Sequence, residues 1–382
     1  MINYNKFQLN SVLLILFFQT LYALPQFALQ EGASCNLCHV NPTGGSLRND
    51  YGTTVFALEE LPMQTMQKFG NEEWDGYIGD YFQIGGDFRI QGLTYNTNNN
   101  QKTAFFPMQA DLYTTMAINK KAEIFYKVSL GQNNPEYWTL LSLIPNDGWL
   151  KIGKTLPNYG LKLDDHTSFI RGGNLNRTQR LSNLPDSIST VKTEGLIFTP
   201  WVNLPAIIEV GYNLTNQISI TSSLANGFIN GSNEDLENIN ITTRLNIIHS
   251  IFNYFNIIGV LSYMQESNLQ LTGISGGISA GNITLSGEID KAINWPKDVT
   301  ALASYGELNY KFKQGIHFVG KYDFYDPNLD WKNGAISRYT FGIEIFPLNI
   351  LEIKLQSRFT QLDLYDVDQP EPEFLIQFHT WF

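Results

Sequence analysis

The stretch "YIGDYFQIGGDFRIQGLTY", residues 77–95, alternates apolar and polar side chains with a period of two. One face is mostly apolar and includes Ile78, Phe82, Ile84, Phe88 and Ile90. The opposite face is polar and includes Gln83, Asp87, Arg89 and Gln91. Because successive side chains of a β-strand point to opposite sides, this alternation predicts a strand with one apolar and one polar face.

The same pattern recurs to the end of the chain, in "IHFVGKYDFY" (316–325), "RYTFGIEIF" (338–346) and "FLIQFHTWF" (374–382). A soluble sandwich would bury such apolar faces, whereas a membrane barrel turns them toward lipid and its polar faces toward a lumen. The many strands and the aromatic residues near their ends favour the barrel. Since bacterial barrels of one chain have an even number of strands, the sequence predicts an all-β fold, a transmembrane outer-membrane β-barrel of about 16 antiparallel strands over residues 76–382.

The composition agrees with a barrel that contacts outer-membrane lipid. Charged residues make up 16% of the chain, against roughly 25% in soluble proteins, and aromatic residues make up 13%. The net charge of −11 argues against nucleic acid as a partner.

The N-terminal residues indicate export. Lys6 precedes the apolar run "SVLLILFF" (11–18), which has the length of a signal-peptide core and is too short to span a membrane as a helix. We expect a signal peptide over residues 1–23. Residues 24–75 form a separate segment that is small for an independent core.

That segment contains "EGASCNLCHVNPTGG" (31–45), with the only two cysteines of the chain. Cys35 and Cys38 are separated by two residues and followed by His39, which is the pattern of c-type haem attachment. Each thiol bonds to one haem vinyl group, and the adjacent imidazole supplies an iron ligand. A disulfide, a redox dithiol and a zinc site are the alternatives, but a zinc site requires further ligands.

The longer stretch "FALQEGASCNLCHVNPTGGSLRNDYG" (27–52) resembles the N-terminus of the fused monohaem cytochrome–porins, a family of outer-membrane electron-transfer proteins that includes iron-oxidising cytochromes. The resemblance implies one covalent haem c, with Cys35 and Cys38 as attachment points and His39 as proximal ligand. The terminal Phe382 likewise resembles the signal that outer-membrane proteins present to their assembly machinery.

A long connection over residues 157–189 lacks the strand pattern and contains "LDDHTSFIRGG" (163–173). Long connections of this kind are commonly functional. We predict His166 as the distal haem ligand, oriented by Asp164 or Asp165, and Arg171 as the partner of a haem propionate. The open alternatives for the distal ligand are Met63 or Met66, His317 or His379, and a site without a protein ligand.

These features predict an electron conduit in the outer membrane of a Gram-negative bacterium. Its partners would be a periplasmic cytochrome or other redox carrier and an extracellular donor or acceptor, with Fe(II) oxidation as the leading specific activity. The alternative is a porin-type solute channel whose haem is a structural or sensory plug. A third class, haem catalysis such as peroxide reduction, requires an open position on the iron.

Overall fold

The computed structural model describes residues 25–65, 74–97, 100–130, 134–161, 167–173, 195–196, 204–229, 238–251, 255–295, 298–363 and 372–382, together with residues 163 and 165. The expected signal peptide lies outside the described residues.

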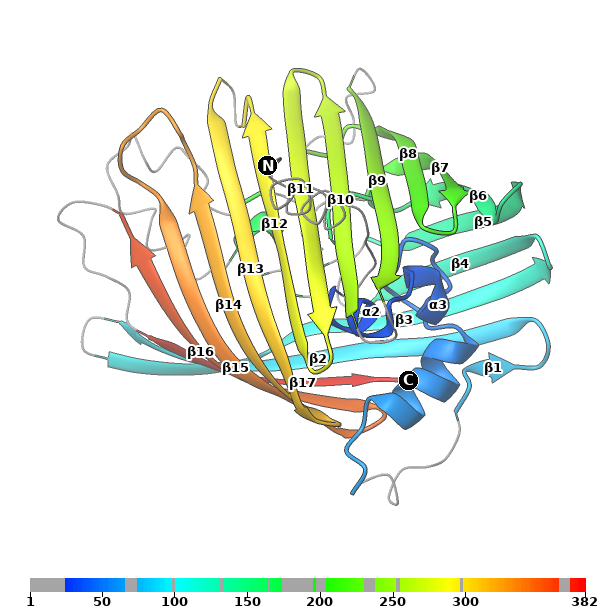
Figure 1. The fold of residues 1–382 in the computed structure, drawn as a ribbon, viewed down its shortest axis with the longest axis horizontal. Coiled ribbons are helices and arrows are strands. Elements are labelled where there is room, and N and C mark those ends of the chain that lie inside the picture. The colour runs from blue at the N-terminus through cyan, green and yellow to red at the C-terminus, as the bar shows by residue number, and fades with distance from the viewer. Residues whose placement is uncertain are drawn as a thin grey trace, which may run out of the picture.

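The chain forms one antiparallel barrel, in which each strand pairs with the next along the sequence (Figure 1). The strands are β2 (Phe82–Thr97), β3 (Asn100–Asn119), β4 (Ala122–Ser129), β5 (Glu136–Ile144), β6 (Gly148–Lys154), β7 (Ala206–Thr215), β8 (Ile218–Asn226), β9 (Ile239–Ile251), β10 (Phe255–Glu266), β11 (Leu269–Ala280), β12 (Ile283–Ile293), β13 (Thr300–Lys313), β14 (Ile316–Asp326), β15 (Ile336–Leu348), β16 (Leu351–Leu362) and β17 (Glu373–Trp381). β17 pairs with β2 and closes the ring, and the two-residue β1 (Tyr77–Ile78) extends β2 at its start. The predicted 16-strand barrel is confirmed.

The two faces of the strands are arranged as the alternation predicts. Ile90 on β2 is 54% exposed on the outside, whereas the adjacent Arg89 is 5% exposed inside the barrel. On β15, Phe341 is 60% exposed and Arg338 only 1%. An apolar exterior around a polar interior is the arrangement of a membrane barrel, and it places the protein in the outer membrane. Among the described residues, no helix has the length and apolar character needed to span a bilayer.

The two mouths of the barrel differ. Tight turns such as those at 120–121, 281–282, 314–315 and 349–350 join neighbouring strands at one mouth, whereas the longer connections join strands at the other. In outer-membrane barrels the short turns are periplasmic and the long loops extracellular. We name the two ends accordingly.

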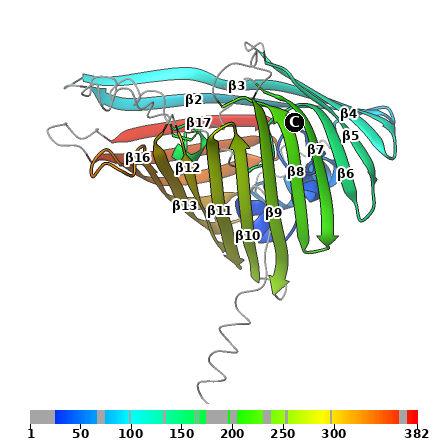
Figure 2. The same ribbon diagram turned by 90° about the horizontal axis from the view of Figure 1, so that it is seen from above.

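Two segments occupy the lumen. The first is the N-terminal segment, with α2 (Pro25–Glu31), α3 (Cys35–Cys38) and the π-helix η1 (Tyr51–Glu60), at the periplasmic mouth. Figure 2 shows its blue helices within the ring of strands. The second is the described start of the connection between β6 and β7, up to residue 173, which contains the short helix η3 (Phe169–Arg171).

Candidate functional site

Polar side chains of the barrel wall hold the end of helix α2. Helices leave their last carbonyl groups without an internal partner. Here Asn256 Nδ2 on β10 donates to Leu29 O at 2.7 Å and to Gln30 O at 3.0 Å. Gly32 follows with φ +61°, and Ala33 N–H donates to Ala28 O at 3.0 Å. This left-handed glycine ends the helix and turns the chain into the cysteine motif.

The cysteine motif forms a single helical turn. His39 N–H donates to Cys35 O at 3.0 Å, so that Cys35 and Cys38 lie on the same side of the turn. Asn49 fastens this turn, because its backbone N–H donates to Cys38 O at 3.1 Å and its side-chain amide donates to Asn36 O at 2.8 Å. Helix η1 then packs on the turn at Gly52, where any Cβ would press against the carbonyl oxygen of Cys38.

Cys35, Cys38 and His39 line one wall of a cavity at the periplasmic end of the lumen. The two cysteines do not form a disulfide with each other, and Cys35 is 2% exposed whereas Cys38 is half-buried. Burial raises the pKa of the Cys38 thiol to about 11; Glu31 adds to the shift and Arg48 opposes it. The thiol therefore stays protonated at neutral pH.

The opposite wall comes from the barrel. Its lining side chains are Phe346 on β15, Glu352 and Lys354 on β16, and His379 and Trp381 on β17. The Arg48 guanidinium lies 4.7 Å from the ring centroid of Trp381, so a cation reaches the cavity from the N-terminal segment as well. The cavity thus combines two thiols and an imidazole with aromatic rings and basic groups.

This combination fits the chemistry of a c-type haem. The thiols and His39 would be the attachment and ligation groups, the aromatic rings suit an apolar macrocycle, and Arg48 and Lys354 suit its propionates. The cavity measures about 110 Å³, smaller than the roughly 300–1,000 Å³ of ligand pockets, so a bound haem has to push the surrounding side chains apart. Among the described residues, no group of three or more His, Cys, Asp or Glu side chains could hold a metal ion such as zinc.

The predicted distal ligand His166 and its neighbour Asp164 lie outside the described residues, so their roles stay predictions. The adjacent Asp165 is described, and its carboxylate lies 2.9 Å from Lys321 Nζ on β14. Burial raises the pKa of Asp165, but Lys321, Arg358 and Arg338 outweigh it and hold that pKa well below its usual range. This part of the connection is therefore anchored to the charged inner wall of β14–β16.

Arg171 belongs to a buried ionic network within the lumen. Its Nη2 lies 2.8 Å from Glu288 Oε1 and donates to Leu161 O at 2.8 Å, and its Nη1 lies 3.6 Å from Asp290 Oδ2. These carboxylates raise the pKa of Arg171 although burial lowers it. Arg171 is not among the residues that line the cysteine cavity. Its pairing with a propionate stays a prediction, and the described structure gives it carboxylate partners instead.

The other candidate ligands differ in their distance from the cavity. Met63 follows η1 and is bound to the periplasmic rim of the barrel, where its N–H donates to Phe346 O at 2.9 Å. Met66 lies outside the described residues. His317 lies behind Phe27 and Phe346, whose rings it meets edge-on at centroid distances of 5.7 Å. Of the candidates that the structure describes, only His379 lines the cavity.

Several residues of the cavity were not predicted from the sequence. Arg48 follows the motif without a pattern that marks it, and Lys354, Glu352 and Trp381 are lumen-facing residues on two of many similar strands. The polar face of each strand identifies the residues that point into the lumen. It does not show which residues of different strands lie at the same level along the barrel axis.

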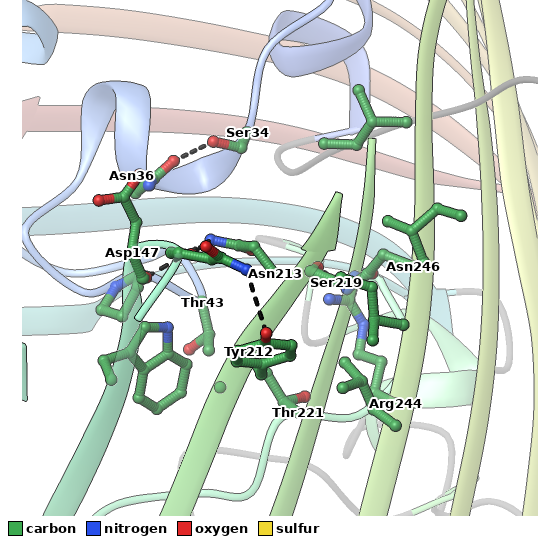
Figure 3. Close-up of a pocket in the computed structure, with 18 of the residues that line it drawn as sticks. Ser34, Asn36, Thr43, Asp147, Tyr212, Asn213, Ser219, Thr221, Arg244 and Asn246 are labelled. Carbon is green, nitrogen blue, oxygen red and sulfur yellow. Dashed lines mark hydrogen bonds between the residues drawn. The ribbon is translucent and has the colours of Figure 1, made fainter. Parts of the chain in front are cut away.

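A second, larger cavity of about 570 Å³ lies on the other side of the cysteine turn, between it and strands β7–β9 (Figure 3). Its walls carry amides and hydroxyl groups, and Tyr212 Oη accepts a hydrogen bond from Asn146 Nδ2 at 3.0 Å. Arg244 lines its inner end and donates from Nε to Gly160 O at 2.8 Å, joining β9 to the connection inside the lumen. A polar vestibule therefore extends from the periplasmic turns toward the middle of the barrel.

The fold is similar to that of bacterial porins. The chain superposes on OmpF of Salmonella typhi with a TM-score of 0.53 at 12% identity, over 80% of this chain and 98% of the porin. The chain superposes on OmpT of Vibrio cholerae with a TM-score of 0.52 at 10% identity, over 81% of this chain and 100% of that protein. It superposes on an anion-selective porin of Comamonas acidovorans with a TM-score of 0.51 at 9% identity, over 79% of this chain and 99% of the porin.

At such low sequence identities, the similarity to these proteins concerns the fold alone. No family model matches the sequence, and no curated protein matches it either. The protein is a porin-like outer-membrane barrel whose N-terminal segment occupies the periplasmic end of its lumen.

Proposed function

We propose that this barrel is an outer-membrane electron conduit. In this proposal, one covalent haem c is attached to Cys35 and Cys38 with His39 as its proximal ligand. A bound haem supplies an iron that cycles between Fe(II) and Fe(III). Electrons would pass between an extracellular donor or acceptor, with Fe(II) as the leading donor, and a periplasmic cytochrome or other carrier.

One observation carries the proposal. The attachment motif lies inside the lumen, against a cavity whose far wall consists of barrel strands β15–β17. A segment this small cannot enclose a haem alone, and here the barrel supplies aromatic and basic groups opposite the thiols. A haem held there would give the barrel a redox centre at the periplasmic end of a hydrocarbon layer that is about 30 Å thick and otherwise insulates the two sides.

The packing of the lumen supports the same function. A continuous cluster of buried side chains includes Leu29 and Cys35 at the periplasmic end, Tyr305 in the middle, and Trp295 and Leu362 near the extracellular ends of their strands. Protein interiors of this kind are close-packed. Cys35 is therefore connected to the extracellular side through packed protein.

The experiment uses sealed liposomes that contain the purified full-length protein and a trapped c-type cytochrome. A membrane-impermeant reductant, or Fe(II), is added outside, and reduction of the trapped cytochrome is followed by absorbance. We expect reduction with the wild type and none above empty liposomes with the C35A/C38A double variant. Wild-type liposomes that contain one covalent haem per chain but behave like empty ones would overturn the conduit.

A second candidate function has its own observation. The polar vestibule beside the cysteine turn, together with the porin-like fold, suits a solute channel in which the haem segment is a structural or sensory plug. Liposome swelling in a neutral sugar distinguishes the two. Rapid swelling without electron transfer supports the channel, and electron transfer without swelling supports the conduit.

A further inference from the structure

The inner wall of the barrel presents one described histidine to the cysteine cavity. His249 on β9 lies at the periplasmic rim, where its Nδ1 contacts Gln217 Nε2 at 2.6 Å. His317 is separated from the cavity by the rings of Phe27 and Phe346. His379 on β17 lines the cavity, on the wall opposite the cysteine turn, and is 6% exposed.

The imidazole of His379 is oriented by the strands on both sides of β17. Its Nδ1 lies 2.8 Å from Glu352 Oε2 on β16, and its Nε2 lies 3.1 Å from Asp87 Oδ1 on β2. The ring also packs edge-on against Trp381, with centroids 4.7 Å apart. Two carboxylates and one indole therefore define the position of this ring.

Each carboxylate also lies next to a cation, and the Lys354 cation beside Glu352 is shared with Glu344. Asp87 accepts from Arg89 Nε and Nη2, both at 3.0 Å, and Glu352 lies 3.3 Å from Lys354 Nζ. Asp87 can therefore release His379 Nε2 without becoming an unpaired buried charge, which would be costly. Glu352 can keep the Nδ1 proton, as carboxylates do behind metal-bound histidines.

We propose that His379 is the distal ligand of the haem iron, binding through Nε2 while Glu352 holds the Nδ1 proton. The inference rests on the proposed function, because it requires a haem on Cys35 and Cys38. It assigns to the closing strand of the barrel the role that the sequence alone predicts for His166. The cavity lining favours His379, since the described neighbours of His166 contact the charged wall near Lys321 instead.

The test compares purified, haem-loaded variants by absorption and electron paramagnetic resonance spectroscopy. The wild type should be low-spin and six-coordinate. H379A should become high-spin and bind carbon monoxide, while haem per chain stays within about twofold of the wild type because both thioethers remain. H317A and H166A, as matched histidine controls, should stay low-spin. Low-spin, carbon-monoxide-inert H379A with full haem content would overturn the assignment.

Two further variants test the assignment if H379A does not assemble. H379M retains a side chain that can ligate iron, so it should stay low-spin at a raised potential, because Met/His ligation raises the potential of c-type haem. E352Q should stay low-spin with an altered potential, since the imidazole ligand is kept while the charged acceptor of its Nδ1 proton is lost. An H379M spectrum and potential identical to those of the wild type would reject His379. A wild type without covalent haem would instead reject the proposed function.

Discussion

At the scale of single residues, the cysteine motif gives the most direct test of the cofactor. The two cysteines do not form a disulfide with each other and line the same cavity as His39. Haem bound through thioethers should remain on the polypeptide during denaturing electrophoresis. The C35A/C38A variant should show no peroxidase-type haem stain at equal protein loading. A stain of undiminished intensity in that variant would exclude covalent attachment.

Gly52 offers a test of how closely η1 has to approach the cysteine turn. A Cβ at this position would press against the backbone carbonyl of Cys38, which cannot move aside as a flexible side chain could. We expect Gly52→Ala to cost about 1–3 kcal/mol, as overpacking commonly does, and to lower the haem-to-protein ratio. Gly306→Ala is the control, because open space surrounds its Cβ position. Equal haem ratios in the two variants would count against this contact.

At the scale of structural elements, the described start of the connection between β6 and β7 is held inside the lumen by buried charges. Arg171 of η3 lies between Glu288 and Asp290, whose side chains are both 0% exposed. Replacing it leaves two buried carboxylates without this partner, and breaking a buried pair in this way commonly costs about 3–5 kcal/mol. Anchoring of the connection is therefore the role that the described contacts support.

We accordingly expect Arg171→Met to make the connection more sensitive to limited proteolysis in detergent. The haem spectrum and its midpoint potential should stay unchanged, because Arg171 does not line the cavity. Arg48→Met is the matched variant at the cavity, and it should shift the potential with little effect on proteolysis. A shifted potential in Arg171→Met would instead support the predicted propionate contact.

The strands could be predicted from the sequence to a greater extent than the cavity. Alternation such as that of Arg89 and Ile90 reports directly on the two faces of one strand, so the barrel and its 16 strands followed from local pattern. The cavity depends on which lumen residues share one height, and that is set by strand register and ring closure. Glu352 and Arg89 lie opposite His379 in the registers of β16 and β2, a relation that no local pattern contains.

At the scale of the whole molecule, the ring closes where the last strand meets the first. Phe382 N–H donates to Gly86 O at 3.2 Å, and Gly86 N–H donates to Phe382 O at 3.1 Å. The Phe382 ring stacks on Phe88 with centroids 6.3 Å apart and meets Trp74 edge-on at 6.5 Å. The terminal residue thus adds backbone and aromatic contacts to the seam.

Deletion of Phe382 should reduce the folded protein in the outer membrane several-fold, because both the seam contacts and the predicted assembly signal are lost. Folded barrel is measured as the fraction that migrates differently on gels before and after boiling. Phe382→Tyr, which keeps an aromatic ring, should assemble close to the wild-type level. Normal amounts of folded barrel after the deletion would show that the terminal residue is dispensable.

The burial of Cys35 inside this closed ring sets an order of events in time. Its thiol is 2% exposed, beneath a wall that is completed only when β17 pairs with β2. An enzyme in the periplasm could not reach that thiol once the N-terminal segment has packed into the lumen, where Cys35 lies against Ala28 and Leu29. In a haem-bearing chain, attachment would have to precede the packing of this segment into the lumen. A haem attached at Cys35 would then enter the barrel together with the N-terminal segment, as part of the packing of the lumen.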